Sequence, residues 1–174
     1  EAASDDLKNA QDSGTMCFTL HKAKGKTQAA IEPWPVTGKH FNAAATSSAS
    51  ADAPAKLVGG IEVTADLSPG KSVTADYSIS WHFNNANVNL KKIVKDAEQG
   101  FHYATRFKDA GAVSTYLQSN FEKLTNTTEL WSTTWNDATL PHWFLERTFI
   151  NIDTLATANT YRFADGRFWS WEGV

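Results

Sequence analysis

The chain has 174 residues, of which 41% are hydrophobic and 20% are charged, and 16 Lys and Arg against 19 Asp and Glu give a net charge of −3. This composition is that of an ordinary folded protein with one large or two small domains. The charges are scattered, which argues against a nucleic-acid-binding surface, because such a surface needs a basic stripe. No apolar run approaches the roughly 18 residues of a membrane span, so no transmembrane segment is predicted.

The first half of the chain has the alternation of β-strands. Gly14–His21 alternates over a short stretch, and two longer alternating runs, Gly60–Leu67 and Ser72–Phe83, flank Ser68–Lys71, where Pro69 and Gly70 are typical of a turn. These two runs predict an antiparallel pair with one solvated face, of the kind found in β-sandwiches. Residues 37–56, rich in Ala and Ser, predict a loop between the strands.

The second half of the chain changes to a helical period after a polar connector. We predict that residues 1–84 are the C-terminal part of a β-sandwich domain, that 85–106 are a linker, and that 107–174 begin a helical domain. Three helices are expected, with short connections that imply antiparallel neighbours. Their apolar stripes are Ala110, Val113, Leu117, Phe121 and Leu124 for the first, Trp131, Trp135 and Ala138 for the second, and Leu145, Phe149, Ile152 and Ala156 for the third.

The helix boundaries are predicted from single residues. Asn126-Thr127-Thr128 offers an N-cap for the second helix, and Pro141 suits the first turn of the third. The same Asn-Thr-Thr triplet has the form of an N-glycosylation acceptor, and the cap is the interpretation we favour. Asp137 and Glu146 are interpreted as helix-face or capping charges, since neither has an acidic partner at a useful spacing.

The C-terminal segment combines aromatic residues with one carboxylate. Five of the seven tryptophans lie between residues 131 and 174, and Asp165-Gly166 predicts a type I′ hairpin between Thr160–Phe163 and Arg167–Trp171. Aromatic faces pack against the C–H surfaces of sugars, and carboxylates carry out glycoside hydrolysis. Glu172, next to Trp169 and Trp171, is therefore the candidate catalytic residue, although a surface Glu is the alternative interpretation and such hydrolysis ordinarily needs two carboxylates.

Other site types have little support in the sequence. The five histidines lack the spacing of zinc ligands, and no metal or other cofactor is predicted. Cys17 has no second cysteine to pair with and is interpreted as a buried small hydrophobe. The tryptophans at 131, 135 and 143 fall at helical spacing, which favours a core role, whereas Trp169 and Trp171 are candidates for a sugar-binding pocket.

Several motifs in their order along the chain resemble one enzyme family. They are Trp81-His82-Phe83, Tyr103-Ala104-Thr105-Arg106-Phe107, Trp131 through Trp135, Leu140-Pro141-His142-Trp143 and Asp165-Gly166-Arg167-Phe168-Trp169-Ser170-Trp171-Glu172-Gly173. Together they resemble glycoside hydrolase family 116, the bile-acid β-glucosidase or non-lysosomal glucosylceramidase family. The resemblance covers about Gly14 to Val174 and is clearer after Ser72.

The resemblance implies an α+β chain in which a partial antiparallel β-sandwich is followed by the first helices of an (α/α)6 barrel. It implies retaining hydrolysis of glucosylceramide-like lipids or other β-glucosides, with Glu172 at the position of the nucleophile. Trp171 replaces the Leu that precedes this Glu in the family, and Asn84 stands where many relatives have Pro. The family's acid/base Asp and its further sugar-binding residues have no counterpart in this sequence.

These features lead us to expect a piece of a longer β-glucosidase, since the chain has no initiator Met and ends two residues after Glu172. Without the acid/base, the piece alone is expected to be inactive. The first alternative is a non-catalytic carbohydrate-binding module in which tryptophans stack on sugar. The second is a structural β-sandwich module that docks a partner. The sequence predicts no oligomeric state.

Overall fold

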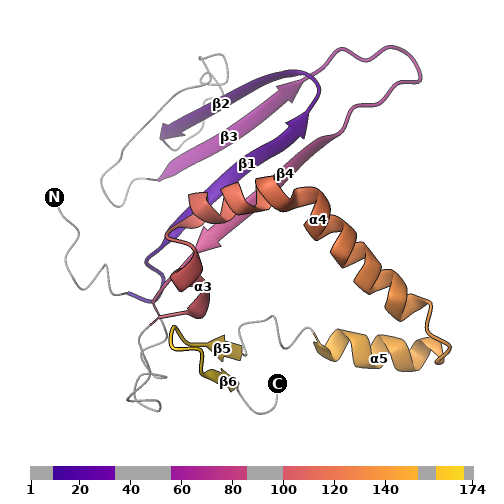
Figure 1. Ribbon diagram of the computed structural model, residues 1–174. Helices are drawn as coiled ribbons and strands as arrows, with labels where there is room; N and C mark the ends of the chain where they lie inside the picture. Colours follow the sequence, from indigo (N-terminus) through magenta and orange to yellow (C-terminus); the bar gives the residue numbers. More distant parts are fainter. Residues whose placement is uncertain (1–9, 34–55, 86–99, 153–159, 171–174) are drawn as a thin grey trace. The chain divides into compact units, whose positions relative to one another are not determined.

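The computed structural model describes residues 10–33, 56–85, 100–152 and 160–170 (Figure 1). The chain divides into two compact units, Phe18–Ile79 and Glu1–Cys17 together with Ser80–Val174. Within the described residues the fold is mixed α+β, with two-stranded sheets and three helices. The α+β class is therefore confirmed in this coarse form. The described ranges contain no closed helical barrel.

Strands β1 (Thr15–Ala23) and β4 (Ala75–His82) form one two-stranded sheet and run in opposite directions (Figure 1). Both strands were predicted, with slightly different bounds. The alternation along β4 is also as predicted, but its exposure is reversed. Tyr77, Ile79 and Trp81 are exposed, whereas Ser80 and His82 are buried. The buried His82 has a hydrogen-bond partner, the Phe107 carbonyl, which is described below.

Strands β2 (Lys26–Pro33) and β3 (Leu57–Thr64) form a second sheet, antiparallel, with Lys26 opposite Thr64 and Pro33 opposite Leu57. This arrangement corrects the predicted hairpin between the two strands that flank Ser68–Lys71. The turn itself exists, since the Lys71 amide donates to the Ser68 carbonyl over 3.1 Å and Gly70 has a φ of 75°. However, the strands before and after it pair with β2 and β1, which are distant in sequence. The predicted 37–56 loop lies outside the described residues apart from Lys56.

The predicted linker, residues 85–106, is described only at its two ends. Residues 101–106 contain helix α3 (His102–Arg106), and the Phe101 amide donates to the Asn84 carbonyl over 3.2 Å. The chain therefore leaves and re-enters the described structure at two hydrogen-bonded positions. Gly100 has a φ of 107°, and a Cβ there would lie 2.7 Å from the Asn84 Oδ1, so this return requires glycine. The linker assignment for residues 86–99, which lie outside the described residues, stays a prediction.

One long helix replaces the first two predicted helices. Helix α4 (Ala110–Asn136) is continuous for 27 residues, so Asn126 is not an N-cap. Thr127 and Thr128 instead donate their hydroxyl groups to the carbonyls four residues earlier, Lys123 and Leu124, as interior helix residues do. Helix α5 (His142–Ile152) begins directly after Pro141, as predicted. The predicted stripe residue Ala156 lies outside the described residues.

Few of the described side chains are fully buried, and they mark where the elements meet. The buried apolar residues are Ala30, Ala110, Leu145 and Phe163, and the buried polar residues are Glu32, Ser80, His82 and Ser114. The start of α4 is fixed by two hydrogen bonds. The Asp109 carboxylate accepts from the Ala112 amide over 2.7 Å, and the Ala110 amide donates to the Thr15 hydroxyl over 2.8 Å.

Candidate functional site

The C-terminal hairpin is present, with a turn one residue longer than predicted. Strands β5 (Thr160–Arg162) and β6 (Phe168–Ser170) are antiparallel, with Tyr161 opposite Trp169. The Gly166 amide donates to the Phe163 carbonyl, and the Phe163 amide to the Arg167 carbonyl, each over 2.9 Å. Gly166 has a φ of 92°, but no described residue other than glycine has a positive φ. A type I′ turn requires positive φ at both central residues, so the predicted turn type is wrong and the hairpin has a three-residue loop.

An ion pair stiffens this loop. The Asp165 carboxylate accepts from the Arg167 backbone amide over 3.0 Å and from the Arg167 Nε over 2.9 Å, and it lies 2.8 Å from the Arg167 Nη2. Both side chains are partly exposed, so the pair contributes little to stability by charge alone. Its effect is geometric, because three contacts hold the side chains on either side of Gly166 in one arrangement.

Residues 100 and 101 extend the hairpin on the side of β5. Phe101 forms a β-bridge with Phe163, and the Ala164 amide donates to the Gly100 carbonyl over 3.1 Å. Phe163 is only 4% exposed, so the bridge lies beside a buried aromatic side chain. These contacts join the start of α3 to the hairpin that precedes Glu172.

A continuous row of rings runs from β4 to β6, and we call His82, Tyr103, Phe101, Tyr161 and Trp169 the aromatic row. Phe101 is stacked with Tyr103 on a centroid distance of 5.5 Å and with Tyr161 on 5.4 Å. Tyr161 lies 6.2 Å from Trp169 across the hairpin, and His82 meets Tyr103 edge-on at 5.2 Å. These separations are those of attractive aromatic pairs. The row therefore connects a strand, a helix and the hairpin.

Hydrogen bonds fix the β4 end of the aromatic row. The buried His82 contacts the Phe107 carbonyl through its Nε2 over 2.7 Å, and because a carbonyl only accepts, this nitrogen carries the proton. The Tyr103 hydroxyl accepts from the Phe83 amide over 3.0 Å and donates to the Phe83 carbonyl. Burial raises the pKa of the Tyr103 hydroxyl above its usual value, and the hydrogen bond with the Phe83 backbone partly opposes this shift.

The predicted site residues are described only in part. Trp169 lies on β6, half-buried, at the end of the aromatic row. Glu172 and Trp171 lie outside the described residues, so their predicted roles stay predictions. The other three members of the row that carry ring stacking, Phe101, Tyr103 and Tyr161, were not predicted as site residues. The clustering of aromatic residues around 101–107 and at 161–171 is the signal in the sequence that could have indicated them.

The remaining candidate acids and tryptophans that the structure describes lie on α4, at its C-terminal end or on α5, and not in the aromatic row. Asp137 is the C-cap of α4, and Glu146 is exposed on α5. Trp135 lies between Trp131 and Phe149, at centroid distances of 6.0 and 5.4 Å, and joins α4 to α5. Trp131 and Trp143 are 52% and 68% exposed, so the predicted core role fails for both of these residues.

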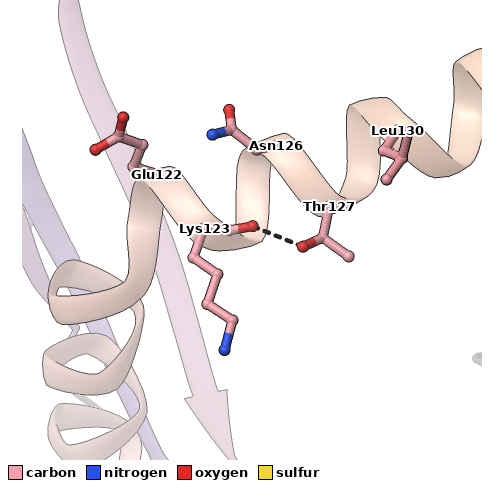
Figure 2. Close-up of a pocket in the computed structure, with 5 residues that line it drawn as sticks. All are labelled: Glu122, Lys123, Asn126, Thr127 and Leu130. Atoms are coloured by element: carbon pink, nitrogen blue, oxygen red, sulfur yellow. Dashed lines mark hydrogen bonds between the residues drawn. The ribbon is translucent and has the colours of Figure 1, made fainter.

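A surface hollow on α4 is a weaker candidate. It is lined by Glu122, Lys123, Asn126, Thr127 and Leu130, which all belong to this one helix and are all exposed (Figure 2). A small-molecule site usually encloses most of its ligand between several elements. A hollow on a single helix offers no opposing wall, so we assign it no ligand.

No metal site and no membrane span is found in the described part of the chain. Nowhere among residues 10–33, 56–85, 100–152 and 160–170 do three His, Cys, Asp or Glu side chains come together as metal ligands would. None of the helices described is both long and apolar enough to cross a bilayer. His40 lies outside these ranges.

Comparison with known proteins gives no match to a family model, to a curated protein or to a solved structure. The resemblance to glycoside hydrolase family 116 therefore stays a prediction from the sequence motifs.

Proposed function

We propose that this chain carries the nucleophile segment of a retaining β-glucosidase that acts on a glucosylated lipid or another β-glucoside. Glu172 is the proposed nucleophile, and Trp169 and Trp171 are the proposed sugar-binding residues. The observation that carries the proposal is the aromatic row, which ends at Trp169, three residues before Glu172. Aromatic rings next to a carboxylate are what a glycosidase needs to bind a sugar and attack its anomeric carbon.

The same proposal gives the fold its finer description. Strands β1 to β4 would be the last strands of a β-sandwich, and α4 and α5 the first helices of an (α/α)6 barrel. Two observations support this view. The two helices are joined by a short connection at residues 137–141, as in neighbouring antiparallel helices, and the hairpin directly before Glu172 is present.

The chemistry requires one group that this sequence does not supply. In a retaining mechanism the Glu172 carboxylate would form a bond to the anomeric carbon while the bond to the leaving oxygen breaks. A general acid would protonate that oxygen, and such proton transfer contributes about 10²- to 10⁴-fold. We therefore expect the chain alone not to turn over ordinary glucosides at a measurable rate.

An activated sugar that needs no acid tests the nucleophile directly. With 2-deoxy-2-fluoro-β-glucosyl fluoride, the Glu172 oxygen would bond to the anomeric carbon as the C–F bond breaks, and fluoride would leave with the bonding electrons. We expect mass spectrometry to find one fluoroglucosyl group on the peptide that contains Glu172. The label should be absent from Glu172→Gln and present in Glu146→Gln, a matched exposed acid on α5. If wild-type protein stays unlabelled, or Glu172→Gln is labelled equally, Glu172 is not the nucleophile.

A second candidate function is non-catalytic sugar binding, and the half-buried Trp169 at the end of the row favours it. Trp169 contacts Tyr161 at a centroid distance of 6.2 Å, and aromatic rings of this kind pack against the C–H surfaces of sugars. In this case a titration with glucose or cellobiose should give a saturable change in tryptophan fluorescence that survives Glu172→Gln. Trp169→Ala should abolish the change, and Trp143→Ala, which alters an exposed ring on α5, should keep it.

A further inference from the structure

Beyond Ser114, helix α4 has no fully buried side chain. Of its 27 residues, only Ala110 and Ser114 are buried, and both lie at its start. Trp131 remains 52% exposed and Phe121 37% exposed, and Leu117 and Leu124 are half-buried. A helix of this length spans about 40 Å, and most helical stability in proteins comes from packing of an apolar face. The far half of α4 thus has an apolar face whose burial is incomplete.

The apolar face follows a heptad spacing. Its residues alternate at steps of four and three along the helix and are Leu117, Phe121, Leu124, Thr128, Trp131 and Trp135. This is the spacing at which two helices pack side by side over several turns, because it keeps one narrow seam facing the neighbour. We call these six residues the α4 seam. At its end, Trp135 contacts Phe149 of α5, so the seam continues onto the second helix.

The area of this face fits a small specific interface. An aromatic side chain has a surface of roughly 150–250 Å². Multiplying such areas by the exposed fractions of the seam residues, half-buried members included, and of Phe149, which is 36% exposed, gives roughly 400 Å² of exposed apolar surface. The smallest specific interfaces bury about 600 Å² per partner, of which about 60% is apolar, or about 360 Å². The face is thus large enough for a dimer of modest affinity.

The residues beside the seam are compatible with a second copy of the same helix. The flanking positions are Gln118, Asn120, Thr125, Thr127, Ser132 and Thr134, which are all uncharged. In paired helices these are the positions where like charges would oppose each other. The charged residues of α4, Glu122, Lys123 and Glu129, lie farther from the seam. Two identical helices would therefore meet without charge repulsion.

We infer that two copies of this chain associate through the α4 seam. The apolar area, the heptad spacing and the uncharged flanks each support this occupant. The inference does not use the sugar chemistry proposed above, and further helices of the proposed barrel are the rival occupant of the seam that the test below separates from a second copy.

Sedimentation velocity of the whole chain at increasing protein concentration tests the inference. We expect the mass to rise from one chain to two and then to stay at two. Leu124→Glu should shift the midpoint of this rise to at least tenfold higher concentration, because a charge would enter the seam. The matched control is Leu130→Glu, which changes a 67% exposed leucine on the opposite side of α4 and should leave the midpoint unchanged. Circular dichroism should show equal helix content in all three proteins.

A cysteine variant keeps the test decisive if Leu124→Glu unfolds the chain. In a Cys17→Ser background, Leu124→Cys should form an intermolecular disulfide under mild oxidation, and Leu130→Cys should not. The inference is overturned by a wild-type chain that stays monomeric at high concentration, which would leave the seam to another occupant such as further helices. It is also overturned by growth beyond two copies, or by equal cross-linking at positions 124 and 130.

Discussion

The aromatic row and the far half of α4 are both rich in aromatic residues, yet they are held in different ways. In the row, rings from three elements stack on one another beside the buried Phe163, and backbone hydrogen bonds join the same elements. In the far half of α4, threonine hydroxyls donate to carbonyls of the helix itself, as Thr127 does to Lys123. Aromatic content alone therefore does not indicate how well a region is packed. The number of helices and strands that meet there is the better indicator.

The largest effect is expected from the centre of the first region. Phe163→Ala removes a ring that is 4% exposed and should lower the free energy of unfolding by about 3–5 kcal/mol. Urea denaturation followed by tryptophan fluorescence would measure it. Phe168→Ala is the matched control in the same hairpin, since Phe168 is 59% exposed, and it should cost less than about 1 kcal/mol. Equal losses for the two variants would mean that the row is not a packed unit.

A smaller effect is expected from the Tyr103 hydroxyl, which links α3 to the end of β4. Tyr103→Phe leaves the ring in the row but removes both hydrogen bonds with the Phe83 backbone. The loss in free energy of unfolding should be about 1–2 kcal/mol, since partly buried backbone groups lose their partner. Tyr116→Phe, a change to an exposed tyrosine on α4, should have almost no effect in the same urea titration.

The same hydroxyl predicts a dependence on alkaline pH. Because burial raises the pKa of Tyr103, the folded chain keeps this proton at pH values where the unfolded chain loses it. Its contribution to stability is therefore complete below the usual value of 10.0 and falls as the pH rises above it. Unfolding curves should be measured at pH 9 and pH 11, which are about one unit either side of a tyrosine's usual pKa. Between these two pH values the free energy of unfolding should fall more for wild-type protein than for Tyr103→Phe. An equal loss in both proteins would contradict the prediction.

The start of α4 connects the two regions, and its cap gives the next effect in size. Asp109→Ala removes the carboxylate that accepts from the Ala112 amide and should cost about 1 kcal/mol. Asp137→Ala at the other end of the helix is the control. It should be neutral or slightly stabilising, because a negative charge is unfavourable near a helix C-terminus. A loss at Asp137 as large as that at Asp109 would argue against a capping effect.

The smallest effect, of opposite sign, is expected in the far half of α4. Thr127→Ala replaces an exposed threonine with the best helix former and should stabilise the chain by about 0.3–0.7 kcal/mol. Thr64→Ala changes an exposed position in β3 and should instead destabilise the chain, by less than about 1 kcal/mol, because threonine is favoured over alanine in strands. Thermal denaturation of both variants checks the sign. Stabilisation by both would mean that local propensity does not explain the difference.

Local patterns predicted β1, β3, β4 and the start of α5, but they missed β2 and α3 and divided α4 into two helices. Long-range contacts decided which strands pair. The alternation around Tyr77 and Trp81 indicated a strand, and Pro141 marked the start of a helix. The partner of each strand depends on segments far apart in the chain, so the turn at Ser68–Lys71 suggested the wrong pairing. The Asn126 cap was wrong because Asn and Thr side chains are tolerated inside a helix when they bond to its own carbonyls.

The candidate site was predicted in the same uneven way. Asp165-Gly166 indicated the hairpin that places Trp169, but the turn type depends on a backbone angle that the two letters do not determine. Phe101 and Tyr161 were missed because they are adjacent only after folding. Glu172 was suggested by its neighbours in sequence and by the family resemblance, and it remains a prediction for the labelling experiment.

The hydrogen bond between Asn84 and Phe101 has a consequence for how this protein could vary or be engineered. An insertion between Gly100 and Phe101 would separate the Phe101 amide from Gly100, whose positive φ belongs to the return of the chain to Asn84. It should therefore disturb both this hydrogen bond and the bridge between Phe101 and Phe163.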